Sequence, residues 1–150
     1  MKKWEKRLKQ PEKFISISYQ KIDFLIPNKY VISSVGVKDV QVTFMQEQHT
    51  GIFDFDEIAI GFSQYPRPTH VRTLIVLKDD NDNKTSIVTT QECKVCSFDL
   101  EKFSLFANPY FEKFKSLGFM ACLFEEGRMR ILIDVQKTID YMSYGELEEI

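Results

Sequence analysis

The sequence has little glycine, histidine, cysteine or tryptophan, and it has no long apolar run. Its 150 residues include six Gly, two His, three Cys and one Trp. No apolar stretch approaches the roughly 20 residues that a membrane-spanning helix needs. No stretch resembles a phosphate-binding glycine loop, a nucleophile elbow or a metalloprotease helix. These absences argue against a membrane protein, and they leave an enzyme hypothesis without an evident site.

The charge is nearly balanced, with 20 Lys and Arg against 22 Asp and Glu. Proteins that bind nucleic-acid backbones usually carry a strong basic excess, so nucleic-acid binding is disfavoured. The basic start of the chain runs into Pro11 instead of an apolar stretch, which predicts no signal peptide. Because the cysteine number is also odd, we expect free thiols and a cytoplasmic location.

The length and the aromatic content favour one domain with a substantial core. A chain of 150 residues with 43% hydrophobic and 28% charged residues has ordinary globular composition. We expect a single domain over residues 1–150, with a basic segment at 1–13 and an acidic tail at 145–150. The 13 Phe and six Tyr would fill this core and leave aromatic contact area for a binding surface.

Period-two alternation predicts strands along much of the chain. Ile15, Ile17 and Tyr19 alternate before a change of parity at Gln20, which indicates a turn or a bulge. Similar patterns occur at 22–26, 30–37, 40–44 and 52–62. Hairpins are predicted at 71–90, with a polar tip at 79–83, and at 119–135, with Gly127 in the turn. The pattern predicts an α+β fold with a mainly antiparallel sheet of about six to eight strands.

A helical block is predicted at about 98–117, together with short helices near both ends of the chain. Ser97 or Asp99 would cap the block, and Asn108 with the proline after it would start its second helix. Gly118 suits the position just after that helix. A short helix is expected before Pro11, and another from Asp134 to about residue 144.

Cys93 and Cys96 form a CxxC motif, which the pattern places between a strand and a helix. A helix N-terminus there would lower a thiol pKa, as in redox sites. The same pair could also hold zinc together with Cys122 and His49 or His70. However, the βαβ context and a second pair are missing, so two small half-buried thiols are the favoured interpretation. We expect no cofactor and no metal.

The candidate binding residues are Tyr65, Arg67, His70 and Arg72, which lie in a stretch with two prolines. Proline keeps the backbone extended, so little entropy would be lost on binding. Tyrosine and arginine are the types that dominate interface hot spots. A rigid loop that only connects two strands is the alternative interpretation.

Two acidic stretches could meet a basic partner, one at residues 54–57 and one at 79–82. Neither has the spacing of an EF-hand calcium loop. The sequence predicts that they are a solvated face and a turn tip, where carboxylates would speed association with a basic surface.

The leading function hypothesis is a non-catalytic protein that binds a protein partner. An inhibitor, or an immunity or anti-defence type protein that occludes its partner, is the narrower form of this hypothesis. The alternative is a ligand-binding protein or small hydrolase that uses Arg67, His70 and Arg72 on a phosphate- or carboxylate-bearing molecule. A subunit of a homo-oligomer is a third hypothesis. No residue is assigned a catalytic role.

Overall fold

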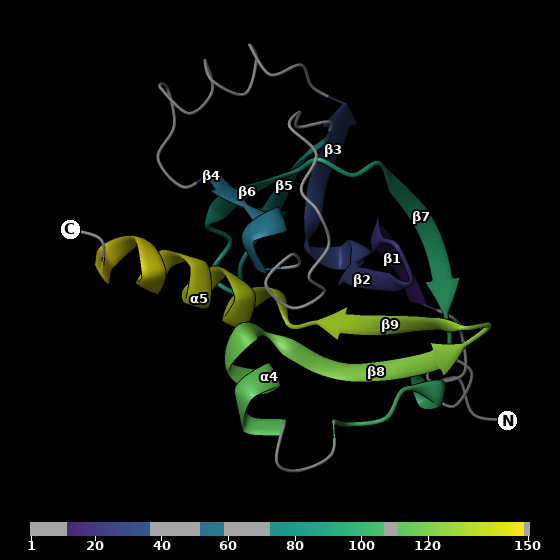
Figure 1. Cartoon of the computed structure of the whole chain (residues 1–150). Coiled ribbons are helices and arrows are strands. Elements are labelled where there is room, and N and C mark those ends of the chain that lie inside the picture. Colours follow the sequence, from purple (N-terminus) through teal and green to yellow (C-terminus); the bar gives the residue numbers. More distant parts are fainter. Residues whose placement is uncertain (1–11, 37–51, 59–72, 107–110, 149–150) are drawn as a thin grey trace, which may run out of the picture.

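The protein forms two β-sheets and a few short helices in this computed structural model (Figure 1). The structure describes residues 12–36, 52–58, 73–106 and 111–148. The strands in these ranges are β1 (Glu12–Tyr19), β2 (Ile22–Pro27), β3 (Val31–Gly36), β4 (Ile52–Asp54), β5 (Thr73–Lys78), β6 (Lys84–Thr89), β7 (Cys93–Phe98), β8 (Phe119–Glu125) and β9 (Arg128–Ile133). The helices are η1 (Asn28–Tyr30), η2 (Leu100–Lys102), α4 (Phe111–Leu117) and α5 (Val135–Glu148).

The mixture of strands and helices confirms the predicted α+β character, but the sheet prediction needs correction. The described residues contain nine strands in two sheets, instead of one mainly antiparallel sheet of six to eight strands. The five-stranded sheet has the order β7-β1-β2-β9-β8, and its β2–β9 pair is parallel. The four-stranded sheet has the order β3-β5-β6-β4, and its β4–β6 pair is parallel. Alternation predicts that a strand exists, but it does not specify its neighbour or its direction.

The parity change at Gln20 is a tight turn between β1 and β2. Ile17 lies opposite Phe24, and Ile15 lies opposite Ile26. Gln20 takes a positive φ of 53°, which lets the chain reverse within two residues. The apolar residues Ile15 and Ile17 of β1 and Phe24 and Ile26 of β2 therefore reach the same face of the sheet, although the two pairs have opposite parity in the sequence.

The five-stranded sheet is buried on both faces. One face belongs to the main core, with Ile17 and Phe24 fully buried. The other face carries a second cluster formed by Phe14, Leu25, Ala121 and Leu132. Successive side chains of a strand point to opposite faces, so each strand contributes to both clusters. This arrangement explains the continuous buried runs in β1, β2 and β9.

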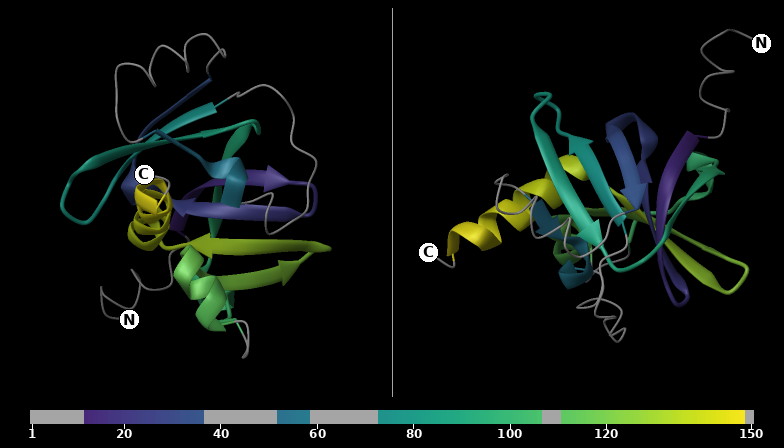
Figure 2. Two further views of the ribbon diagram at one scale, coloured as in Figure 1. Left: turned by 60° about the vertical axis from the view of Figure 1, so that its left-hand side comes forward. Right: turned by 90° about the horizontal axis from the view of Figure 1, so that it is seen from above.

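The main core lies where the two sheets and the two α-helices meet. Phe24 of the five-stranded sheet packs edge-to-face on Phe55 at a centroid distance of 5.4 Å. Ile75 and Ile87 contribute from the four-stranded sheet, and Ile139 contributes from α5. Figure 1 shows α5 leaving the end of β9 and running beside β4 and β6. Figure 2 shows the same helix against that sheet from two further sides.

The predicted helical block is shorter and more broken than expected. Residue 98 still belongs to β7, and only η2 and α4 are helical among the described residues of this stretch. Asp99 does cap η2, because its side chain accepts a hydrogen bond from the Glu101 N–H. At the other end of the chain, α5 continues to Glu148, beyond the predicted end near residue 144. Of the predicted 52–62 strand, residues 52–54 are extended and residues 55–58 form a helical turn.

Both predicted hairpins are confirmed. β5 and β6 pair antiparallel around the tip at 79–83, where the Asp79 side chain accepts the Asn81 and Asn83 N–H groups. β8 and β9 pair around Glu126 and Gly127, both with positive φ. No helix in the described ranges is long and apolar enough to cross a membrane.

Gly118 joins α4 to β8 at a point where α5 comes very close. Its φ is +91°, and a Cβ there would lie 2.0 Å from Thr138 Oγ1 and 2.8 Å from Thr138 N. We predict that Gly118→Ala lowers the free energy of unfolding by about 3 kcal/mol or more, because strain and a backbone clash add together. Urea unfolding measures this loss.

The matched control for this prediction is Gly127→Ala. Gly127 also has a positive φ, but nothing lies within 4 Å of the position its Cβ would take. We expect this variant to cost only about 1 kcal/mol. Equal losses in the two variants would show that the approach of α5 to Gly118 is unimportant for stability.

Candidate functional site

An open groove lies where the five-stranded sheet, the β5–β6 tip and the start of α5 come together. It has a volume of about 230 Å³. The sheet contributes the start of β1, the ends of β2 and β9, and the start of β8. Its lining residues are Glu12, Phe14, Pro27, Lys29, Tyr30, Asp80, Leu100, Met120, Leu132, Ile133, Asp134 and Val135.

The groove has an apolar floor and partly exposed apolar side chains among its lining residues. Phe14 and Leu132 on the floor are buried in the second cluster of the five-stranded sheet. Leu100 of η2 and Met120 of β8 are 39% and 44% exposed. Large apolar side chains left partly in water next to a concave surface are typical of sites that bind a partner or a ligand.

The charged residues of the groove are predominantly acidic. Glu12, Asp80 and Asp134 contribute three carboxylates, and Lys29 is the single basic residue of the lining. The Lys29 ammonium lies over the Tyr30 ring, 5.2 Å from its centroid. Among the described residues, none of the three carboxylates forms an ion pair. The groove therefore presents negative charge beside apolar surface.

Local hydrogen bonds hold the acidic residues in place. The Asp134 carboxylate accepts the Lys137 N–H at 3.1 Å and so caps α5. The Asp80 N–H donates to Gln136 Oε1 at 3.0 Å, which ties the β5–β6 tip to the first turn of the same helix. Glu12 lies at the start of β1 and pairs with Phe98 of β7. The carboxylates thus come from three elements that are fixed relative to one another.

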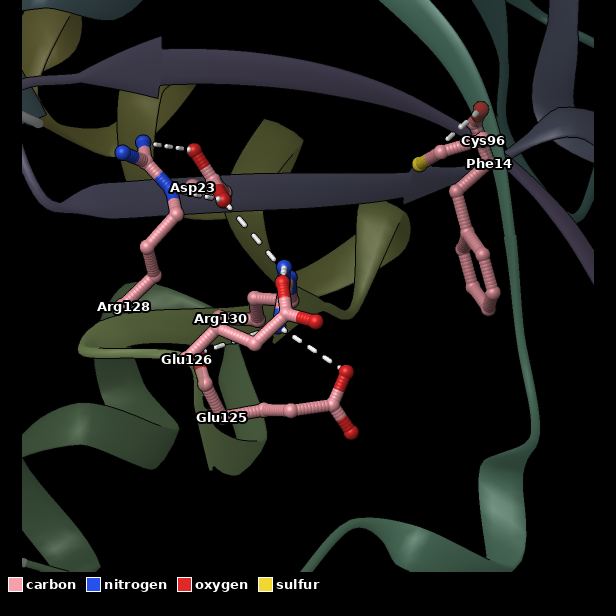
Figure 3. A network of polar contacts seen from close by, with 7 residues as sticks. All are labelled: Phe14, Asp23, Cys96, Glu125, Glu126, Arg128 and Arg130. Atoms are coloured by element: carbon pink, nitrogen blue, oxygen red, sulfur yellow. Dashed lines mark hydrogen bonds and ion pairs between the residues drawn. The ribbon is translucent and has the colours of Figure 1, made fainter.

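A second polar feature occupies the far end of the same sheet face, around Asp23 (Figure 3). Arg128 Nε and Nη2 donate to the two oxygens of Asp23, at 2.9 and 2.5 Å. Arg130 Nε lies 3.7 Å from Asp23, and its Nη1 lies 3.4 Å from Glu125. Burial opposes ionisation of Asp23, but hydrogen bonds from Arg128 and Ser18 outweigh it, and its pKa is lowered.

Arg130 shows that the five-stranded sheet curls. Its guanidinium lies over the Phe98 ring at 4.7 Å, although β1 and β2 separate β9 from β7 in the sheet. Ser104 also bridges to Cys122 of β8 through two backbone hydrogen bonds, so the chain after β7 reaches the opposite edge. Asp23 is thus ion-paired at the start of β2, and the groove lies at the other end of that strand.

Asp56 is a fully buried carboxylate that no ligand can reach. It accepts hydrogen bonds from Tyr19 Oη, from Thr89 Oγ1 at 2.8 Å and from the Thr90 N–H at 3.1 Å. Burial, followed by the hydrogen bond to Asp56, raises the pKa of Tyr19 far above its usual value. Tyr19 belongs to the five-stranded sheet and Thr89 to the four-stranded sheet. The cluster is therefore a structural link between the sheets.

This burial corrects the prediction that residues 54–57 are a solvated acidic face. Asp56 is completely enclosed, and Asp54 accepts the Asp56 N–H at 3.0 Å. Only Glu57 of this stretch is exposed. Composition cannot separate a surface carboxylate from one whose charge is met by buried hydroxyls.

The CxxC motif lies inside a strand and not before a helix, so that prediction was wrong. Cys93 and Cys96 both belong to β7, where positions three apart face opposite sides. Cys93 packs against the main core, and Cys96 packs against the second cluster. This placement is at odds with a shared metal ion or a shared disulfide. No group of three metal-binding side chains was found in the described part of the chain.

The thiols also lack the acidity of reactive cysteines. Burial raises the pKa of Cys93 to about 11, and it raises the pKa of Cys96 and Cys122 as well. All three thiols are free and half-buried. The interpretation of Cys93 and Cys96 as half-buried thiols is confirmed.

The sequence-predicted binding residues Tyr65, Arg67, His70 and Arg72 lie outside the described residues. Their assignment stays a prediction. The groove was not predicted, because its lining comes from eight separate segments of the chain and no local motif marks it. One signal was available: the acidic tip at 79–82 contributes Asp80, which does line the groove.

Fold and groove together describe a small protein of two sheets whose open concave site is apolar and acidic. No protein-family model matches the chain, and none of the curated proteins matches its sequence. Among solved structures, the fold resembles the scaffolding protein TtCheW from Thermoanaerobacter tengcongensis, with a TM-score of 0.56 and 12% sequence identity. The likeness covers 83% of this chain and 89% of that one. At this identity it shows the fold alone.

The buried tyrosine predicts a specific loss of stability at alkaline pH. Tyr19 keeps its proton in the folded protein, whereas in the unfolded chain it loses the proton above its usual value of 10.0. The contribution of Tyr19 to the free energy of unfolding is therefore fully present below pH 10. Above that pH it falls by about 1.4 kcal/mol per pH unit. We predict that Tyr19→Phe flattens this slope in urea unfolding measured at several alkaline pH values.

Thr89→Val is the control for this experiment. It removes another hydroxyl from the same cluster but no titrating group. We expect it to lower stability at every pH by about 1 kcal/mol and to keep the wild-type slope. Identical slopes in wild type and Tyr19→Phe would contradict the proposed burial of the Tyr19 hydroxyl.

Proposed function

We propose that this protein is a non-catalytic binding protein that acts by docking a protein partner in the groove. The observation that carries the proposal is the concave site itself, in which an apolar floor and exposed Leu100 and Met120 lie beside carboxylates that have no ion-pair partner among the described residues. Interfaces of non-obligate complexes combine an apolar centre with a polar rim in this way.

The other chemistry-bearing groups of the described residues have structural roles. The Asp56 carboxylate is enclosed, Asp23 is bound by Arg128, and burial raises the thiol pKa values. The fold resembles that of a protein described as a scaffolding protein. A scaffold needs docking surfaces and no reaction centre, which agrees with an open groove among the described residues.

The inhibitor or immunity type is a narrower form of the same proposal. An inhibitor would abolish the activity of its partner when the two are mixed, whereas a scaffold would leave that activity intact. A cytoplasmic location, which the sequence predicts, would give either type access to intracellular partners. An assay of the purified partner alone and in complex decides between the two types.

The test of the proposal is affinity capture from a lysate of the source cells with the full chain as bait. Leu100→Ser with Met120→Ser removes the exposed apolar side chains of the groove. We predict that wild type captures one protein at a defined ratio. The double variant should capture at least roughly tenfold less of this protein, as expected for the loss of interface anchors.

The matched control removes two exposed apolar side chains outside the groove lining. Val95 and Phe124 are 69% and 73% exposed, and Val95→Ser with Phe124→Ser should capture the partner as wild type does. Capture that is equal for all three baits would remove the groove from the proposal. The absence of any protein partner would overturn the proposed function.

A further inference from the structure

We infer that the groove receives a segment of the partner in which an apolar side chain stands next to lysine or arginine. This inference rests on the proposed function and adds the chemistry of the partner to it. It is built on the shape, the charge and the rigidity of the groove.

The shape and size favour a side chain of a larger molecule over a free small molecule. Pockets for drug-sized ligands have volumes of about 300 to 1,000 Å³. This groove has about 230 Å³, and its lining includes Leu100 and Met120, which are both partly exposed. One or two apolar side chains can reach the floor at Phe14 and Leu132 while the rest of the segment stays outside.

The charge favours a basic segment. Three carboxylates surround the groove against one ammonium, and none of the three is neutralised by a described residue. Glu12 and Asp80 are exposed, so they are available to a guanidinium or an ammonium group of a partner. An acidic partner, or the phosphate backbone of a nucleic acid, would be repelled at the same positions.

Charge also argues against a second copy of this chain as the occupant. A symmetric contact would place the groove of one copy against the same groove of another. The carboxylates of Glu12, Asp80 and Asp134 would then approach their own equivalents, which costs free energy. A different protein with complementary charge avoids this cost.

The backbone that bears the carboxylates is held before any partner arrives, and the Asp134 carboxylate is held as well. Asp134 is fixed as the cap of α5, and the backbone of Asp80 is tied to Gln136 in the first turn of that helix. Ordering costs on binding are therefore small, so even a short segment should bind measurably.

The experiment begins with a phage-displayed library of random peptides, selected on the immobilised full chain. We expect enrichment of peptides that combine an apolar residue with neighbouring Lys or Arg. A labelled peptide from this pool is then titrated by fluorescence anisotropy at low and at high salt. Its affinity should fall with salt, because exposed charges are screened.

Variants with altered charge test the site directly. Glu12→Gln with Asp80→Asn should weaken binding of the peptide roughly tenfold, since two exposed attractions are lost. Lys29→Gln changes the charge in the opposite direction and should strengthen binding. Both changes are isosteric or nearly so and lie at exposed positions, so wild-type urea unfolding is expected and confirms that the fold is kept.

Three results would overturn the inference: no enrichment of any peptide, enrichment of acidic or purely apolar peptides, or a peptide affinity that none of the three charge substitutions changes. A dimer of the chain that Met120→Ser dissolves would also overturn it, in favour of a second copy. If lysate capture still depends on Leu100 and Met120, these results leave the proposed function standing. If capture fails as well, both are wrong.

Discussion

The two sheets are joined around one buried carboxylate, and the position of the groove follows from that junction. The Asp56 carboxylate accepts hydrogen bonds from the hydroxyl groups of Tyr19 in one sheet and Thr89 in the other, next to the apolar main core. A buried charge is tolerated only when it is fully hydrogen-bonded, so the partners of Asp56 must keep this arrangement. The junction joins the end of β6 to the five-stranded sheet, and the Asp80–Gln136 hydrogen bond ties the β5–β6 tip to α5, where both line the groove.

The curled five-stranded sheet has two different ends. At one end, Asp23 accepts two hydrogen bonds from Arg128 and forms an ion pair with Arg130. At the other end, carboxylates without described ion-pair partners stand next to exposed Leu100 and Met120. A carboxylate that already has ion-pair partners gains little from a further cation, whereas carboxylates without such partners, beside apolar surface, gain more from a basic partner. This contrast is the physical basis for assigning binding to the groove.

Local patterns in the sequence predict local structure here and little beyond it. The alternation at Ile15–Tyr19, the hairpin with Gly127 and the cap at Asp99 all appear as expected. The parallel β2–β9 pair and the second sheet depend on contacts between distant segments, which periodicity does not encode. The same limit explains the errors on Cys93, Cys96 and Asp56. It also explains why a groove assembled from eight segments of the chain was not foreseen.

Amide hydrogen exchange of the full chain, alone and with its captured partner, tests the central claim most directly. The account predicts slower exchange on binding at the start of β1, in η1, at the β5–β6 tip and in the first turn of α5, because these elements line the groove. Exchange at the Asp23 end of the sheet should stay unchanged. Slower exchange at residues 64–72 without any change at the groove would contradict the account and would favour the binding residues proposed from the sequence.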